Sequence, residues 1–151
     1  MSEPALLEVA DLSVRFGAVT AVTSISFGVA KGEVFGVVGE SGAGKSAMAR
    51  GIIGLLPPVA RMGGSVRFKG EELIGASKSR LRRVRGSGIG YVFQDALTAL
   101  DPVRTVGAQL VEARQVHLPS SRKEALQAAE ELLAELKIAD PLRALRSYPH
   151  Q

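Results

Sequence analysis

The chain has 151 residues, a length typical of one domain, and 46% of them are hydrophobic, which is enough for a buried core. It has no cysteine, which excludes disulfides. Its start lacks a signal-peptide pattern, and no apolar run approaches the roughly 18 residues that span a bilayer, so we expect neither a leader nor a membrane span. The net charge of +4 is concentrated between Lys78 and Gly86, where no aromatic residue interleaves, so we expect no nucleic-acid partner.

The first thirty residues predict two antiparallel strands. Apolar and polar residues alternate between Val9 and Phe16 and again between Ile25 and Val29, as they do in half-buried strands. The sequence Lys31 to Glu33 then predicts a turn. The next segment, Val34 to Val38, is continuously apolar and β-branched and ends at a glycine. It predicts a strand that is buried on both faces of a parallel sheet.

A helix is expected over residues 45–56, because the composition is helical and Pro57 and Pro58 cannot continue it. The stretch from Gly63 to Leu73 predicts an edge strand, with turns at Gly63-Gly64 and at Gly70. The basic run from Arg80 to Arg85 is interpreted as a solvated loop. A second buried strand is predicted from Ile89 to Gln94.

Helical composition dominates from Asp95 onward. Residues 105–117 predict a helix with Val106, Leu110 and Ala113 on one face. Ser121 and Glu124 have the spacing of a capping box, which marks the start of another helix. Behind this box lies an apolar stripe that we expect to be core rather than partner surface. It consists of Leu126, Ala129, Leu132, Leu133 and Leu136.

The segment GESGAGKS, Gly39 to Ser46, matches the phosphate-loop pattern G-x-x-x-x-G-K-[ST]. Glycine permits positive φ angles, so backbone N–H groups can turn inward around a phosphate chain, and the helix that follows directs its positive end at the same anion. Lys45 supplies a full charge, and the Ser46 hydroxyl is a ligand suited to Mg²⁺. The predicted nucleotide contacts are Gly39, Glu40, Ser41, Gly42, Ala43, Gly44, Lys45, Ser46 and Ala47.

Small kinases, GTPases, RecA-like motors and ABC ATPases share this loop, and the flanking residues distinguish them. A β-rich stretch precedes the loop here, and YVFQD, Tyr91 to Asp95, follows it and leads into a helical region. This order resembles the nucleotide-binding domain of ABC ATPases. The resemblance implies an α/β P-loop NTPase fold, with an antiparallel β-subdomain and a RecA-like core in residues 1–94 and the start of a helical subdomain in residues 95–151.

Three longer segments resemble one subgroup, the ATP-binding subunits of dipeptide and oligopeptide importers, which also include nickel importers. They are VVGESGAGKSAMARGIIGLLPP, RGSGIGYVFQDALTALDPVRTVGAQLVE and the closing YPHQ. Ala96, Ala99 and Asp101 depart from the usual residues of the subgroup, which puts the solute in doubt. The resemblance implies ATP and Mg²⁺ as ligands, two transmembrane permease subunits, a second ATP-binding subunit and, indirectly, a solute-binding protein. It also implies a location on the cytoplasmic face of the membrane.

The same resemblance assigns two further roles. Phe16 stands where the family has an aromatic ring that stacks on adenine, although it could simply be a core residue at a strand end. Gln94 would reach Mg²⁺ and the attacking water, so that Lys45 and Gln94 are the predicted catalytic residues; a buried glutamine that satisfies backbone groups is the alternative. His117 and His150 receive no role.

The family continues after YPHQ with a glycine-rich signature and an acidic strand end, so we expect an incomplete domain that is marginally stable and does not hydrolyse ATP alone. The resemblance implies ATP hydrolysis coupled to transport for the intact subunit. Three alternatives stay open: an ABC ATPase that acts on nucleic acid or ribosomes, a small P-loop phosphotransferase, and a truncated product without enzymatic function.

Overall fold

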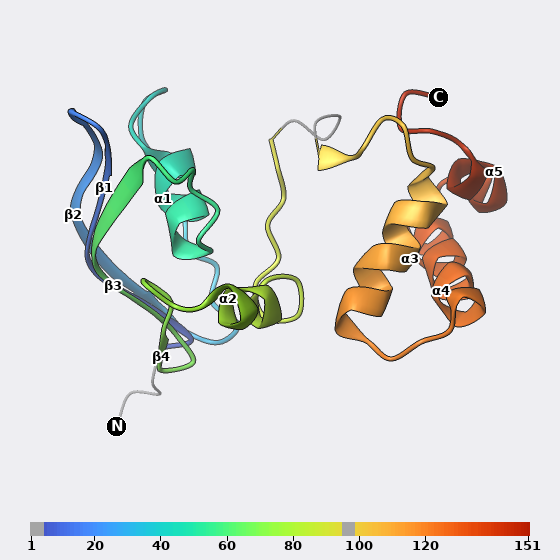
Figure 1. Cartoon of the computed structure of the whole chain (residues 1–151), viewed down its shortest axis with the longest axis horizontal. Coiled ribbons are helices and arrows are strands. Elements are labelled where there is room, and N and C mark those ends of the chain that lie inside the picture. Colours follow the sequence, from blue (N-terminus) through green and yellow to red (C-terminus); the bar gives the residue numbers. More distant parts are fainter. Residues whose placement is uncertain (1–4, 95–98) are drawn as a thin grey trace. The chain divides into compact units, whose positions relative to one another are not determined.

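The computed structural model describes residues 5–94 and 99–151, which divide into two compact units, Met1–Ile89 and Gly90–Gln151 (Figure 1). In the part of the chain that the structure describes, the first unit holds a four-stranded sheet and two helices, and the second holds three helices. Asp95, where the resemblance starts the helical subdomain, and Ala96 lie outside the described residues. The described part contains no helix that is long and apolar enough to cross a membrane.

The sheet of the first unit is antiparallel throughout, with the strand order β2-β1-β3-β4. Its strands are β1 (Leu7–Phe16), β2 (Val19–Val29), β3 (Ala60–Phe68) and the two-residue β4 (Glu71–Glu72). The predicted hairpin of β1 and β2 is therefore confirmed. The edge position predicted for β3 is wrong, because β3 pairs with β1 on one side and with β4 on the other.

The Gly63-Gly64 pair forms a β-bulge and not the predicted turn. The β1–β3 register shifts between Ala10 and Ser13, and Gly64 lies opposite this irregularity with a φ of +90°. A Cβ atom on Gly64 would lie 2.4 Å from the carbonyl oxygen of Asp11. A bulge admits one extra residue and brings the two backbones this close, which only glycine tolerates here.

Helix α1 (Lys45–Ile52) begins where the sequence predicts it, but it ends before the two prolines. Gly54 adopts a left-handed φ of +66°, its N–H donates to the Gly51 carbonyl at 2.9 Å, and the Leu55 N–H donates to the Arg50 carbonyl at 2.7 Å. These two bonds define a Schellman motif, in which a glycine stops the helix and satisfies its last carbonyls. The predicted end at residue 56 is therefore wrong because of Gly54.

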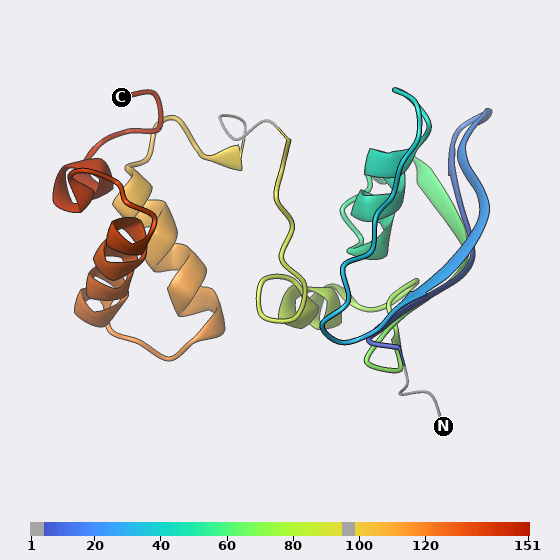
Figure 2. The ribbon, with the colours of Figure 1, turned by 180° about the vertical axis from the view of Figure 1, so that it is seen from behind.

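The sheet-facing side of α1 includes Gly51. A Cβ atom there would lie 3.2 Å from the Met62 side chain and 3.6 Å from that of Val14, so the helix packs closely on β3 and β1. Figures 1 and 2 show α1 and α2 on the same face of the sheet. The buried apolar residues of this unit are Val9, Leu12, Val14, Val22, Met48, Ile52, Ile53, Val66, Phe68, Leu73 and Val84.

The basic run that the sequence predicts as a loop forms helix α2 (Lys78–Val84). Ser77 caps the helix by accepting a hydrogen bond from the Arg80 N–H at 3.3 Å. Val84 is buried, and the Leu81 side chain lies against Gly54. The loop prediction is wrong because two apolar residues among the arginines are enough to attach one helical face to the core.

The two predicted buried strands do not form. Val34, Val38 and Val92 are 97%, 95% and 94% exposed, and neither 34–38 nor 89–94 is assigned to a strand. A strand is defined by hydrogen bonds to a neighbour, and a parallel strand needs neighbours on both sides to bury both faces. Among residues 5–94 and 99–151, the strands that form a sheet are the four antiparallel ones, so these segments have no such neighbour.

The second unit consists of α3 (Val106–His117), α4 (Arg122–Glu135) and α5 (Pro141–Arg146). The predicted capping box is confirmed. The Ser121 N–H donates to the Glu124 carboxylate at 2.7 Å, and the Glu124 N–H donates to the Ser121 hydroxyl at 3.2 Å.

The faces that these helices bury match the predicted ones only in part. Of the stripe predicted for α4, Ala129 is buried and Leu133 is half-buried, whereas Leu126, Leu132 and the C-cap residue Leu136 are 41%, 47% and 65% exposed. The other buried residue of α4 is Ala125. On α3 the buried residues are Gly107 and Val111 rather than Val106, Leu110 and Ala113. The three helices contact one another, and α3 approaches α5 closely at Gly107, where a Cβ atom would lie 2.6 Å from the Leu145 carbonyl oxygen. Glycine at position 107 permits this close approach of the two backbones, and Leu145 is buried in the contact.

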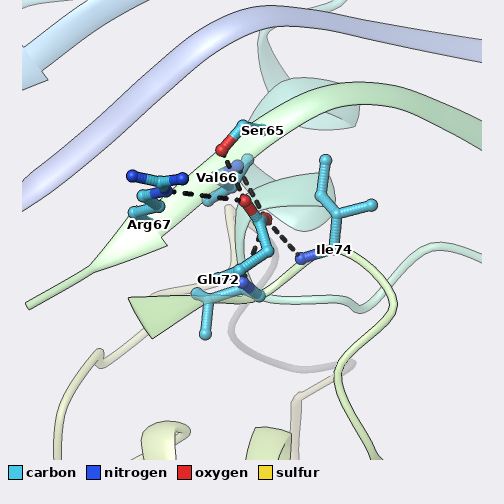
Figure 3. Close-up of polar contacts among 6 residues, drawn as sticks. Ser65, Val66, Arg67, Glu72 and Ile74 are labelled. Carbon is cyan, nitrogen blue, oxygen red and sulfur yellow. Dashed lines mark hydrogen bonds and ion pairs between the residues drawn. The ribbon is translucent and has the colours of Figure 1, made fainter. Parts of the chain in front are cut away.

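Glu72 closes the turn between β3 and β4 (Figure 3). One carboxylate oxygen accepts the N–H groups of Val66, Leu73 and Ile74 at 3.0, 3.1 and 2.9 Å, and the other accepts the Ser65 hydroxyl. Desolvation acts to raise the pKa of Glu72, but the hydrogen bonds from Ser65 and the three backbone N–H groups outweigh it, and the pKa is lowered.

We expect a pH-dependent contribution of Glu72 to stability. A lowered folded-state pKa means that the contribution is present above the unfolded-state pKa of a glutamate and is lost as the pH falls through the folded-state value. Glu72→Gln should cost roughly 1 kcal/mol at neutral pH and little at pH values below both pKa values. Urea unfolding at several pH values measures this, with Glu8→Gln on the exposed side of β1 as the control. An equal loss at all pH values would contradict the prediction.

Candidate nucleotide-binding site

The phosphate loop is an irregular segment that connects residue 38 to α1. Gly42 and Gly44 adopt φ angles of +84° and +83°, as predicted, whereas Gly39 does not have a positive φ. A Cβ atom on Gly39 would lie at an ordinary 3.4 Å from the Ala43 Cβ. Two left-handed residues separated by one therefore turn the backbone, and this is the conformation that directs successive N–H groups to one side.

Gly44 anchors the loop to the sheet. A Cβ atom at this position would lie 2.1 Å from the carbonyl oxygen of Ala21 and 3.1 Å from the Val22 side chain, both in β2. The backbone of the loop therefore touches the backbone of the strand, which fixes the start of α1 relative to the sheet. The sequence pattern did not predict the contact of Ala21 with the loop, because the alternation of residues in a strand does not show which loop packs against that strand.

The Lys45 side chain folds back across the loop that precedes it. Its ammonium nitrogen, Nζ, donates to the carbonyl oxygens of Gly39 and Glu40, both at 2.7 Å. The Ala43 N–H also donates to the Glu40 carbonyl, at 3.2 Å. These bonds close the loop into a ring and hold the positive charge of Lys45 beside it. A phosphate group bound at the loop can accept a hydrogen bond from the same ammonium group.

The amino end of α1 is suited to an anion. Its N-cap, Gly44, has no side chain to cap the helix, and no acidic residue lies in the first turn. The first intrahelical bond runs from the Met48 N–H to the Gly44 carbonyl at 2.8 Å, so the N–H groups of Lys45, Ser46 and Ala47 have no intrahelical acceptor. Ser46 is exposed beside them. Together with the helix dipole, these donors can hold phosphate oxygens.

The residues 5–94 and 99–151 contain no cluster of three or more His, Cys, Asp or Glu that could hold a metal ion. A protein cage is not required for the predicted ion. Mg²⁺ at nucleotide sites is usually held by one or two protein oxygens together with the phosphates and water. The exposed Ser46 hydroxyl fits that donor set.

The other two predicted site residues lie apart from the loop in the chain. Phe16 is the last residue of β1, pairs with Val19 and Ala60, and is half-buried. Gln94 is exposed and belongs to the second unit. The adenine contact of Phe16 and the metal contact of Gln94 stay predictions.

Comparison with known proteins gives one family. The family model described as ABC transporter matches residues 22–151. The oligopeptide transport ATP-binding protein OppD of Mycobacterium tuberculosis is 50% identical over 151 residues, which cover 97% of this chain and 25% of the relative. A probable peptide ABC transporter ATP-binding protein of Sinorhizobium fredii is 47% identical over 152 residues, and the dipeptide transport ATP-binding protein DppD of Bacillus subtilis is 43% identical over 152 residues. Each of these two alignments covers 97% of this chain and 45% of the relative. The chain thus spans between a quarter and just under half of the length of these relatives.

Proposed function

Because the chain belongs to the ABC transporter family, we propose that it is the nucleotide-binding part of an ATP-binding subunit that powers peptide import across a membrane. The observation that carries the proposal is the loop of residues 39–46, which brings a lysine charge and the free N–H groups of α1 to one place. The peptide substrate is supported by the names of the relatives, which are oligopeptide, peptide and dipeptide transport proteins.

In this proposal the phosphates of ATP lie along residues 39–47, and Lys45 neutralises the charge on the terminal phosphates. Ser46 and Gln94 contribute oxygen ligands to Mg²⁺, and Phe16 stacks on adenine. Gln94 also orients the attacking water. The loop geometry supports the first part, and the resemblance supports the rest.

The proposed partners are two permease subunits, a second ATP-binding subunit and, indirectly, a solute-binding protein, with the chain on the cytoplasmic face of the membrane. The relatives named as transport ATP-binding proteins support this assignment. No observation favours the nucleic-acid or phosphotransferase alternatives.

Lys45→Ala should weaken the binding of Mg-ATP by the 151-residue chain. Loss of a charge-assisted bond to phosphate costs about 1.5–3 kcal/mol, which corresponds to roughly 10- to 100-fold in Kd. Isothermal titration calorimetry with Mg-ATP measures the effect. Lys123→Ala, which removes the same charge from an exposed position on α4, is the matched control and should leave the Kd unchanged. An unchanged Kd for Lys45→Ala would sink the proposed function.

A further inference from the structure

The carboxyl end of α1 is held by one side chain from a later part of the chain. Arg85 donates from Nε to the Ile53 carbonyl at 2.7 Å and from Nη2 to the Gly54 carbonyl at 2.5 Å. The planar guanidinium reaches two successive carbonyls at once, and its charge lies at the negative end of the helix dipole. Figures 1 and 2 both show α2 beside this end of α1.

Arg85 is also part of a tightly bonded turn, Val84–Ile89. The Gly88 and Ile89 N–H groups both donate to the Val84 carbonyl, at 2.9 and 2.8 Å, and the Gly86 N–H donates to the Ile89 carbonyl at 3.0 Å. A Cβ atom on Gly88 would lie 2.9 Å from the Phe68 ring, so the turn packs closely on the sheet. The Arg85 backbone is thus part of one closely packed, hydrogen-bonded unit.

Both ends of α1 thus have defined attachments. Its amino end is the proposed phosphate site, and its carboxyl end is bonded to Arg85. The helix has eight residues, about 12 Å at 1.5 Å per residue, which is short enough to move as a rigid rod. Five residues beyond the turn lies Gln94, the proposed ligand of Mg²⁺.

We propose that Arg85 is a positioning residue that couples nucleotide binding at the amino end of α1 to the Val84–Ile89 turn and so to the segment that carries Gln94. The inference rests on the proposed function, since it requires a nucleotide at the loop. The exposed Arg82 lies on α2, three residues before Arg85, and carries the same charge. Among the described residues, no hydrogen bond joins its side chain to α1.

Hydrogen exchange followed by mass spectrometry on the 151-residue chain, with and without Mg-ATP, tests the coupling. In the wild type, ATP should slow amide exchange at 45–48 and also in the Val84–Ile89 turn, the latter by roughly tenfold. Arg85→Lys keeps the charge but replaces the two-carbonyl fork by a single ammonium group. It should keep the protection at 45–48 and lose most of that in the turn, whereas Arg82→Lys should keep both.

Three results would overturn the inference. The first is that, in the wild type, ATP slows amide exchange at residues 45–48 but not in the Val84–Ile89 turn. This result is decisive even if Arg85→Lys fails to fold. The second is an Arg85→Lys chain that keeps both responses. The third is the absence of any response at 45–48 in the wild type, which refutes the proposed function itself and the inference with it.

Discussion

Gly44→Ala should abolish detectable ATP binding and destabilise the first unit by about 3 kcal/mol or more. Gly44 has a left-handed φ of +83°, which costs an alanine roughly 1–2 kcal/mol. Its new Cβ atom would also lie 2.1 Å from the carbonyl oxygen of Ala21. That neighbour is backbone within a paired strand, so the loop must move away from β2, and overpacking of this kind costs typically 1–3 kcal/mol more.

Gly42→Ala is the matched control, because it separates backbone strain from collision. Gly42 has nearly the same φ, +84°, but a Cβ atom there would meet no atom within 4 Å. We expect it to cost only the roughly 1–2 kcal/mol of strain and to weaken ATP binding without abolishing it. Urea unfolding and calorimetric titration with Mg-ATP measure both quantities. Equal losses for the two variants would show that the contact between Gly44 and Ala21 does not fix the loop.

The features that the sequence predicted correctly have local causes. The β1–β2 hairpin follows from alternation, and the start of α4 follows from a capping box whose two bonds join residues three apart. The phosphate loop follows from a fixed spacing in which Gly42 and Gly44 permit left-handed backbone. Each of these patterns contains its own determinant within about ten residues, so a reading of the sequence alone reaches it.

The features that the sequence did not predict depend on partners far along the chain. Residues 34–38 have the composition of a buried strand, yet a strand exists only where another strand pairs with it. The exposed Leu126 and Leu132 of α4 show the same limit: the apolar stripe was predicted, but not that Ala129, with Ala125 beside the stripe, would be the buried residues of α4 in the unit it forms with α3 and α5. Arg85 lies in a basic run that composition describes as solvated, and only the folded chain places it on the carbonyls of Ile53 and Gly54.

The backbone conformation of the loop could therefore be predicted from the sequence. The contacts that support the loop and α1 could not be predicted, because they come from distant parts of the chain. Ala21, which packs against the loop, lies 23 residues before Gly44, and Arg85, which binds the carboxyl end of α1, lies 33 residues after Ile52. Lys45 is part of the sequence motif, but its bonds to the carbonyl oxygens of Gly39 and Glu40 are evident only in the folded chain.

Gly64→Ala should produce the largest loss of stability of any single alanine substitution proposed for the sheet, about 3–5 kcal/mol. The residue has a φ of +90°, and its new Cβ atom would lie 2.4 Å from the Asp11 carbonyl oxygen and 2.5 Å from that of Ala10. Both oxygens belong to β1, the central partner of β2 and β3. Relief of the collision must separate β3 from β1 beside the fully buried Leu12 and Val66, so it opens the core of the unit.

Gly63→Ala, one residue earlier, provides the control for this experiment. Gly63 does not have a positive φ, and a Cβ atom on it would meet nothing within 4 Å. Because glycine inside a strand is less favourable than alanine by roughly 0.5–1 kcal/mol, this variant should be as stable as the wild type or slightly more stable. Urea unfolding followed by far-ultraviolet circular dichroism compares the two. If Gly64→Ala unfolds at the same urea concentration as Gly63→Ala, the bulge does not hold β3 against β1, and the close contact between these backbones is not what fixes the register of the sheet.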